Sequence, residues 1–184
     1  MISRPDRHHG LHRRPPTGGG FTLVELTMVI VVVAILAAVS FPRLTSLPTT
    51  RARYAARQLF KDLTFARERA ISTGTRSFVV FAPASETYTL LAENPSNPGR
   101  ANAVIIDDPS SGQPFVRTFG SSEFVGVDLV SAVFDGAAEV GFDWNGRPLN
   151  STQSDLSATG TITLSGGNLV QVQSPGGLIT CTTP

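Results

Sequence analysis

The chain has 184 residues, of which 41% are hydrophobic, so it can bury one domain core and is not composed like a disordered protein. The formal net charge of +1 conceals an uneven distribution, because residues 1–20 carry four arginines and one aspartate. All three histidines also lie in residues 1–20, and the single cysteine is Cys181, which excludes most common acid–base and metal chemistry and any internal disulfide from the rest of the chain.

Residues 18–42 read GGGFTLVELTMVIVVVAILAAVSFP and carry no formal charge after Glu25. A helix over residues 21–42 rises ~1.5 Å per residue and therefore spans roughly the ~30 Å hydrocarbon layer of a bilayer. We predict a transmembrane helix at residues 21–42, with a helix break at Pro42, because proline interrupts the hydrogen-bond ladder.

Three interpretations of this segment compete. It is an ordinary secretory signal cut after the small residues Ala38-Val39-Ser40, a plain uncleaved anchor, or a retained helix that follows a short leader. Glu25 counts against the first two, because an ionised group in a membrane helix costs ~2.5–3.5 kcal/mol at mid-helix and a smaller amount near the end.

A glycine run, Phe21, four further residues ending in Glu25, and an apolar helix together resemble the signal of the type IV pilin and pseudopilin superfamily. The resemblance implies that residues 1–20 are a cleaved basic leader and that a prepilin peptidase cuts between Gly20 and Phe21. It also implies N-methylation of Phe21 and an assembly contact between its new amine and Glu25 of a neighbouring subunit. Such a pair would set the register of assembly, because a charge pair in low dielectric tolerates little misplacement.

Residues 43–75 are predicted to form an amphipathic stalk helix. Small and apolar residues recur at steps of three and four and therefore share one face: Ala52, Ala56, Leu59, Leu63, Ala66 and Ala70. Thr49 or Thr50 can cap the start of this helix, and Gly74 can end it. The many arginines of residues 43–76 are interpreted as a solvated helix face. The alternative is that this basic face meets acidic faces of neighbouring subunits or an anionic lipid surface.

Residues 76–184 consist of short apolar or alternating runs separated by turn residues, which predicts an antiparallel β-sandwich-like head. Asn145-Gly146 and the SGGN stretch at residues 165–168 are hairpin signals, and residues 93–102 are typical of an exposed loop. The predicted fold class is therefore α+β, with a long N-terminal helix, first transmembrane and then amphipathic, before a β-rich globular head.

Two features of the head are interpreted as structural. Asp107 and Asp108 are adjacent and point apart, so we expect a turn there and neither a catalytic nor a metal site. Phe142 and Trp144 alternate, which is typical of one buried face of a sheet. We therefore predict that the protein is not an enzyme and uses no cofactor, metal or small-molecule substrate.

The stretches FDWNGRP and GTITLSGGNLVQVQSPGGLIT resemble the C-terminal half of the GspH/FimT group of minor pilins and pseudopilins. The resemblance implies a minor subunit of a type II secretion system or a type IV pilus, incorporated near the tip of a periplasmic filament. Before assembly it would span the bacterial inner membrane once, with a periplasmic head. Its implied partners are prepilin peptidase, other minor and major (pseudo)pilins, and the inner membrane. The orientation follows from the resemblance, because the arginines after the span do not favour a cytoplasmic N-terminus.

Two alternative functions stay open: a DNA-binding minor pilin for DNA uptake, and an ordinary secreted β-domain with a cleaved signal peptide. Phosphate binding needs clustered Lys or Arg. The C-terminal glycine turn, SPGGLITCTTP, contains neither residue type. We therefore do not expect nucleic acid as a partner.

Overall fold

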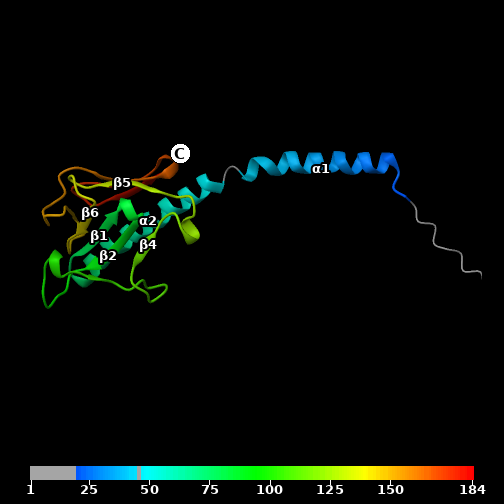
Figure 1. The fold of residues 1–184 in the computed structure, drawn as a ribbon. Helices are drawn as coiled ribbons and strands as arrows, with labels where there is room; N and C mark the ends of the chain where they lie inside the picture. The colour runs from blue at the N-terminus through cyan, green and yellow to red at the C-terminus, as the bar shows by residue number, and fades with distance from the viewer. Residues whose placement is uncertain (1–19, 45–46) are drawn as a thin grey trace, which may run out of the picture. The chain divides into compact units, whose positions relative to one another are not determined.

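The computed structural model describes residues 20–44 and 47–184, and the chain divides into two compact units, Met1–Arg43 and Leu44–Pro184 (Figure 1). The first unit contains helix α1, and the second contains helix α2 and all the strands. Apart from Gly20, the predicted leader at residues 1–20 lies outside the described residues.

Helix α1 spans Leu23–Leu44. It begins after Thr22, which acts as the N-cap: the Glu25 N–H donates to Thr22 Oγ1 at 3.2 Å, and the Leu26 N–H donates to the Thr22 carbonyl at 3.1 Å. The predicted helix break does not fall at Pro42, because α1 continues past it to Leu44. Proline removes only its own donor and its fixed φ is helical, so it need not stop a helix at its own position.

Within residues 20–44 and 47–184, no helix is long and apolar enough to cross a membrane. The transmembrane character predicted for residues 21–42 is therefore not shown. The predicted continuity of one long helix depends on residues 45–46, which lie outside the described residues.

Helix α2 spans Leu47–Thr73 and supplies one wall of the head core. The six predicted face residues are all buried, and Ala55 joins them with no exposed surface. The helix ends before Gly74, whose φ of +65° is the left-handed conformation that a helix C-terminus commonly adopts at glycine. The spacing of the apolar residues thus predicted the inward face of this helix, and Gly74 predicted its end.

The first sheet has six antiparallel strands: β1 (Ser77–Ala82), β2 (Thr87–Ala92), β3 (Val104–Ile105), β4 (Val116–Thr118), β6 (Glu139–Phe142) and β7 (Pro148–Leu149). Strand β2 pairs with β1 along one edge and with both β3 and β4 along the other. The sheet order is β3-β2-β1-β6-β7, so β3 lies at an open edge.

The second sheet has four antiparallel strands: β5 (Leu129–Val133), β8 (Gly160–Leu164), β9 (Asn168–Val172) and β10 (Ile179–Thr182), in the order β10-β9-β8-β5. Four single-turn 3₁₀ helices lie between strands: η1 (Pro83–Ser85), η2 (Arg100–Asn102), η3 (Ser122–Phe124) and η4 (Ser165–Gly167). The predicted α+β class with antiparallel sheets is confirmed.

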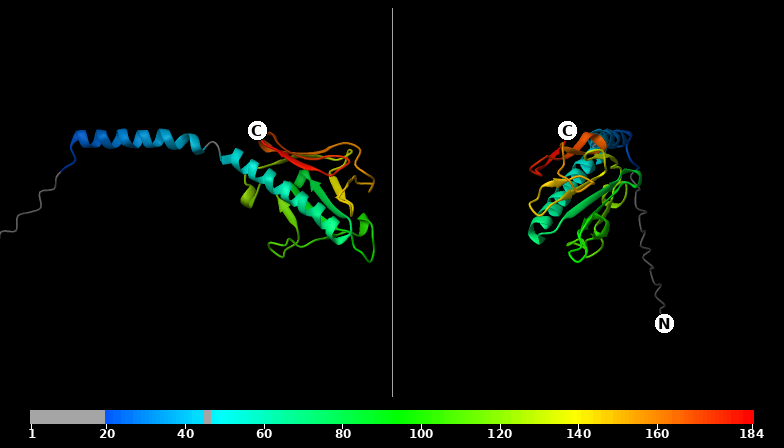
Figure 2. Two further views of the ribbon diagram at one scale, coloured as in Figure 1. Left: turned by 180° about the vertical axis from the view of Figure 1, so that it is seen from behind. Right: turned by 90° about the vertical axis from the view of Figure 1, so that its left-hand side faces the viewer.

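Helix α2 packs against strands of both sheets, β1 and β6 in one and β9 and β10 in the other (Figure 2). A run of aromatic rings continues this core, with successive centroids 5.4 to 6.1 Å apart: Tyr54, Phe124, Phe119, Tyr88, Phe81 and Phe134. The head is therefore held together by helix-on-sheet packing as well as by the two sheets expected of a sandwich.

Both predicted hairpin turns are present. Strands β6 and β7 pair across the Asn145-Gly146 turn, and β8 pairs with β9 across η4. Phe142 is fully buried as expected, but Trp144 is 52% exposed, so its predicted core position is wrong. The alternation fails because β6 ends at Phe142 and Trp144 already lies in the turn, where side chains no longer follow the pleat.

Candidate assembly site

The first turn of α1 carries the residues that the sequence singles out. Gly20, Phe21 and Thr22 precede the helix, and Glu25 lies in its first turn. Phe21 is 82% exposed, and Glu25 is exposed as well. A carboxylate in this position interacts favourably with the positive end of the helix dipole. The structure therefore presents an exposed apolar ring and an exposed acid, four residues apart in the sequence, at the start of one helix.

Thr22 is a residue of this site that the sequence analysis did not single out. Its side chain satisfies the Glu25 N–H, one of the donors that a helix N-terminus leaves without an intrahelical partner. The spacing Thr22-x-x-Glu25 is that of a capping box, which was readable in the letters TLVE. The cap explains why α1 starts at Leu23 and why residues 20–22 stay outside the helix.

From Leu23 to Leu36, the surface of α1 is largely apolar and exposed. Its large apolar side chains are between 53% and 79% exposed: Leu23, Val24, Leu26, Met28, Val29, Ile30, Val31, Val32, Val33, Ile35 and Leu36. Soluble monomers rarely expose a continuous apolar surface of this extent. Exposed apolar surfaces of this size mark sites of contact with another protein or with lipid.

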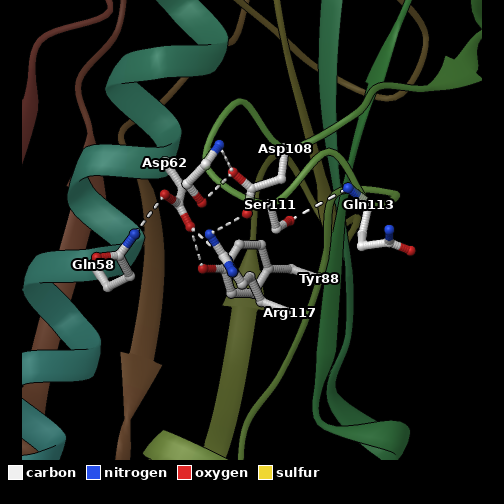
Figure 3. Close-up of polar contacts among 8 residues, drawn as sticks. Gln58, Asp62, Tyr88, Asp108, Ser111, Gln113 and Arg117 are labelled. Atoms are coloured by element: carbon white, nitrogen blue, oxygen red, sulfur yellow. Dashed lines mark hydrogen bonds and ion pairs between the residues drawn. The ribbon is translucent and has the colours of Figure 1, made fainter.

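A group of polar side chains lies inside the head, where it joins α2 to the first sheet (Figure 3). Asp62 of α2 accepts a hydrogen bond of 2.7 Å from the Tyr88 hydroxyl and one of 2.9 Å from Gln58 Nε2. Arg117 of β4 lies between two carboxylates, with Nη2 at 2.8 Å from Asp108 Oδ2 and Nε at 3.6 Å from Asp62 Oδ2. This cluster, Asp62–Tyr88–Arg117–Asp108, ties α2, β2, β4 and the loop after β3 to one another.

The pKa values of the two carboxylates in the cluster are shifted in opposite directions. Burial raises the pKa of Asp62 above its ordinary value, against the lowering effect of the Tyr88 hydrogen bond and the Arg117 charge. Burial also acts to raise the pKa of Asp108, but the hydrogen bonds from Ser110 and the charge of Arg117 lower it overall. Burial raises the pKa of Tyr88 well above its ordinary value, so its hydroxyl keeps the proton that it donates to Asp62.

Asp107 and Asp108 lie at the turn that the sequence predicted. Asp108 starts the predicted turn, because its Oδ1 accepts from the Ser110 N–H at 2.8 Å and its carbonyl accepts from the Gly112 N–H at 2.7 Å. Asp107 is exposed while Asp108 is buried, so the two point apart. Among the described residues, no group of His, Cys, Asp and Glu is placed to hold a metal ion.

Several stalk arginines donate to backbone carbonyls of the head, so the basic face is not simply solvated. Arg67 Nε donates to the Gly146 carbonyl at 2.9 Å, and its Nη2 donates to the Gly176 carbonyl at 3.4 Å. Arg51 donates to the Val125 carbonyl at 3.4 Å. Arg67 thereby joins the β6–β7 turn to the C-terminal glycine turn. Arg67 and Gly176 are more than a hundred residues apart in the sequence, and no sequence pattern predicts their contact.

In the head, helix α2 packs against two antiparallel sheets, and in the chain it follows the apolar helix α1. No protein-family model and no curated protein matches the sequence. The minor pseudopilin EpsH from the type 2 secretion system of Vibrio cholerae has a similar structure, with 13% sequence identity. Two solved structures of EpsH align with TM-scores of 0.53 and 0.54, over 73% and 74% of this chain and 96% of that chain. The type IV minor pilin FimU of Pseudomonas aeruginosa aligns with a TM-score of 0.44 and 16% identity, over 73% of this chain and 93% of that chain. The similarity to EpsH confirms the minor pseudopilin-like fold that the sequence resemblance implied.

Proposed function

We propose that this protein is a minor pilin or pseudopilin, a non-enzymatic subunit that assembles with other pilin-like subunits into a periplasmic filament. The observation that carries the proposal is the exposed apolar surface of α1, with the exposed Glu25 in its first turn. In a filament, the α1 helices of neighbouring subunits cover this surface. Glu25 then pairs with the amine of Phe21 on the next subunit, because an acid among apolar helices is stable only when it has a partner.

Cleavage by prepilin peptidase between Gly20 and Phe21 is the processing step that this assembly requires. A Cβ added at Gly20 would meet nothing within 4 Å, so the fold itself does not require glycine there. We attribute the glycine to the peptidase, since the backbone at a scissile bond must approach the protease closely. The Thr22 cap supports this, because it leaves the Gly20–Phe21 bond outside the helix and open to attack.

The head supports a minor role in the filament, near its tip, in a machine of the type II secretion or type IV pilus kind. The EpsH-like fold of the head supports the minor role, whereas the position near the tip and the choice of machine rest on the sequence resemblance to the GspH/FimT group. Before assembly, the apolar surface of α1 is covered by lipid of the inner membrane, with the head in the periplasm. Methylation of the Phe21 amine completes the mature subunit.

The mature N-terminus, measured by mass spectrometry on protein from the native host, tests the proposal. We expect a chain that starts at methylated Phe21 and retains α1. A chain that starts at Phe41 would instead be an ordinary secreted domain and would overturn the proposal. The Gly20→Leu variant should keep its leader, while Gly176→Leu, a glycine of the head with open space around it, should be processed normally.

A further inference from the structure

A cavity of about 540 Å³ lies between the C-terminal half of α2 and the open edge of the six-stranded sheet. It is lined by Arg69 of α2, by residues 92–95 at and after the end of β2, and by residues 104–107 at and after β3. None of these lining residues belongs to the first turn of α1 or to the Asp62–Tyr88–Arg117–Asp108 cluster.

Arg69 has hydrogen-bonding capacity that the head does not use. Its Nε is buried without a hydrogen-bond partner, and its guanidinium makes no ion pair with any described residue. The previous and next arginines in the sequence have partners: Arg67 donates to two backbone carbonyls, and Arg76 Nη1 contacts Gln153 at 3.0 Å and Glu93 at 3.6 Å, although the Arg76 Nε is also without a partner. A buried Nε–H without an acceptor costs free energy, so an acceptor that enters the cavity and reaches the Arg69 Nε gains a hydrogen bond.

The chemistry of the cavity favours a neutral carbonyl as that acceptor. Glu93 is already engaged, because its Oε1 accepts from the Gly99 N–H at 2.8 Å and its Oε2 accepts from the Arg76 N–H at 3.2 Å. Asp107, which also lines the cavity, is exposed and would repel an incoming carboxylate. Backbone carbonyls are also the acceptors that Arg51 and Arg67 of the same helix already use.

Strand β3 presents an open backbone edge beside this cavity. The Ile106 N–H donates to the Leu90 carbonyl at 3.2 Å, and Ile105 is paired with Leu91 in register. In an antiparallel ladder this makes Ile105 a non-hydrogen-bonded pair, so its own N–H and carbonyl point away from β2. Val104 and Ile105 are 53% and 48% exposed, so the open edge is flanked by apolar side chains.

We propose that an extended segment of a neighbouring filament subunit adds to the edge of β3 as a further strand. Its backbone pairs with the N–H and carbonyl of Ile105, its apolar side chains cover Val104 and Ile105, and one of its carbonyls accepts from Arg69 in the cavity. An extended peptide fits this place because its backbone supplies both donors and acceptors. The N–H and carbonyl of Ile105 and the Nε–H of Arg69 could all bond to such a backbone, and no described residue uses them. This inference rests on the proposed function, because the occupant is another pilin-like subunit.

Site-specific photocrosslinking of the full chain in its native host tests this contact. A photoreactive p-benzoylphenylalanine at Val104 should crosslink to a second pilin-like subunit, identified by mass spectrometry, through an extended segment of that subunit. The same group at Val130, which is exposed on the other sheet, should not give this product. Crosslinking at Val104 only to lipid or to proteins unrelated to pilins would overturn the inference.

Two variants test the hydrogen bonds themselves. Ile105→Pro removes the outward N–H without touching the ladder to β2, and proline is tolerated in an edge strand. We expect it to lower the crosslink yield about fivefold, as expected for one lost hydrogen bond, whereas Ile105→Ala, which keeps the N–H, should change it less. Arg69→Gln should also lower the yield, and Lys61→Gln, an exposed residue of α2 outside the cavity, should not. Unchanged yields in both Ile105→Pro and Arg69→Gln would refute the proposed pairing.

The processing state separates this inference from the proposed function. Each strain is assayed for a Phe21 N-terminus and for incorporation into filaments. A subunit that is processed and incorporated but gives no crosslink from Val104 disproves only the added strand. A subunit that is neither processed nor incorporated, even without the photoreactive group, disproves the proposed function as well.

Discussion

The hydroxyl of Tyr88 on β2 donates a hydrogen bond of 2.7 Å to Oδ2 of Asp62 on α2, inside the core of the head. Tyr88 is 1% exposed and Asp62 is 5% exposed, so neither group can exchange this bond for one with water. The contact fixes the position of the stalk helix on the sheet.

Tyr88→Phe should therefore destabilise the head although it removes a single oxygen. The variant leaves a buried carboxylate short of one donor, and hydrogen bonds to charged groups contribute ~1.5–3 kcal/mol. The expected loss in the free energy of unfolding is of that size, measured by urea denaturation. Tyr54→Phe, whose ring is 49% exposed, is the matched control and should cost little. Equal stability of the two variants would contradict a role for the buried bond.

Arg117→Gln should lower the free energy of unfolding of the head more than the removal of an exposed cation does. Its side chain is 24% exposed and faces Asp62 and Asp108, whose side chains are 7% and 6% exposed, so both lose their counter-charge. Breaking a buried ion pair from one side costs ~3–5 kcal/mol. Arg147→Gln breaks the pair with Asp155, in which the side chains are 48% and 52% exposed, and should cost below ~1 kcal/mol. Denaturation of both variants under one condition measures the difference.

Asp108 should contribute a pH-dependent part of the stability of the head. Its pKa is lowered in the folded state, so its contribution is present above the unfolded-state pKa and is lost as the pH falls through the folded-state pKa. Asp62, with a raised pKa, acts in the opposite direction and disfavours the folded state as the pH rises through its range. Asp108→Asn should therefore be less stable than the wild type near neutral pH and should lose less stability on acidification. If the free energy of unfolding falls equally in the two proteins on acidification, Asp108 is not the group responsible.

Gly160→Ala should destabilise the head by overpacking. A Cβ at Gly160 would lie 2.0 Å from Cδ1 of Phe134, a ring with no exposed surface and stacked on Phe81. Overpacking of a dense core costs ~1–3 kcal/mol, and more where the ring cannot move. At Gly176, a Cβ would meet nothing within 4 Å, so Gly176→Ala should leave the midpoint of thermal unfolding nearly unchanged. A similar shift in both variants would mean that Phe134 yields without strain.

Glu25→Gln should spare leader cleavage but weaken incorporation into filaments. The substitution keeps the size of the side chain and the backbone N–H that Thr22 caps, and it removes only the charge. Loss of a desolvated charge pair should lower incorporation about tenfold or more, relative to Glu123→Gln in the head. Quantitative immunoblotting of sheared filaments and of whole cells measures the effect. Full incorporation of the Glu25→Gln variant would remove the pairing argument.

The amino-acid sequence by itself determined the order of the elements and the local chemistry. The apolar run, the three- and four-residue spacing of α2, and the hairpin turns at Asn145-Gly146 and residues 165–168 depend on neighbouring residues alone, so their pattern is readable. Glycine, Phe21 and Glu25 carried the resemblance from which the processing and assembly site was predicted. The resemblance carried by these letters pointed to the fold that EpsH shares.

Only the tertiary structure decided which distant residues meet. Asp62, Tyr88, Asp108 and Arg117 come from four parts of the chain, and no spacing in the sequence links them. Trp144 illustrates the same limit, because its alternation with Phe142 predicted burial while the end of β6 places it in an exposed turn. The open edge of β3 and the unused guanidinium of Arg69 likewise appear only after the strands have paired. Patterns of two to four residues report on local geometry, whereas partners in a core or at a sheet edge are chosen by the packing of the whole head.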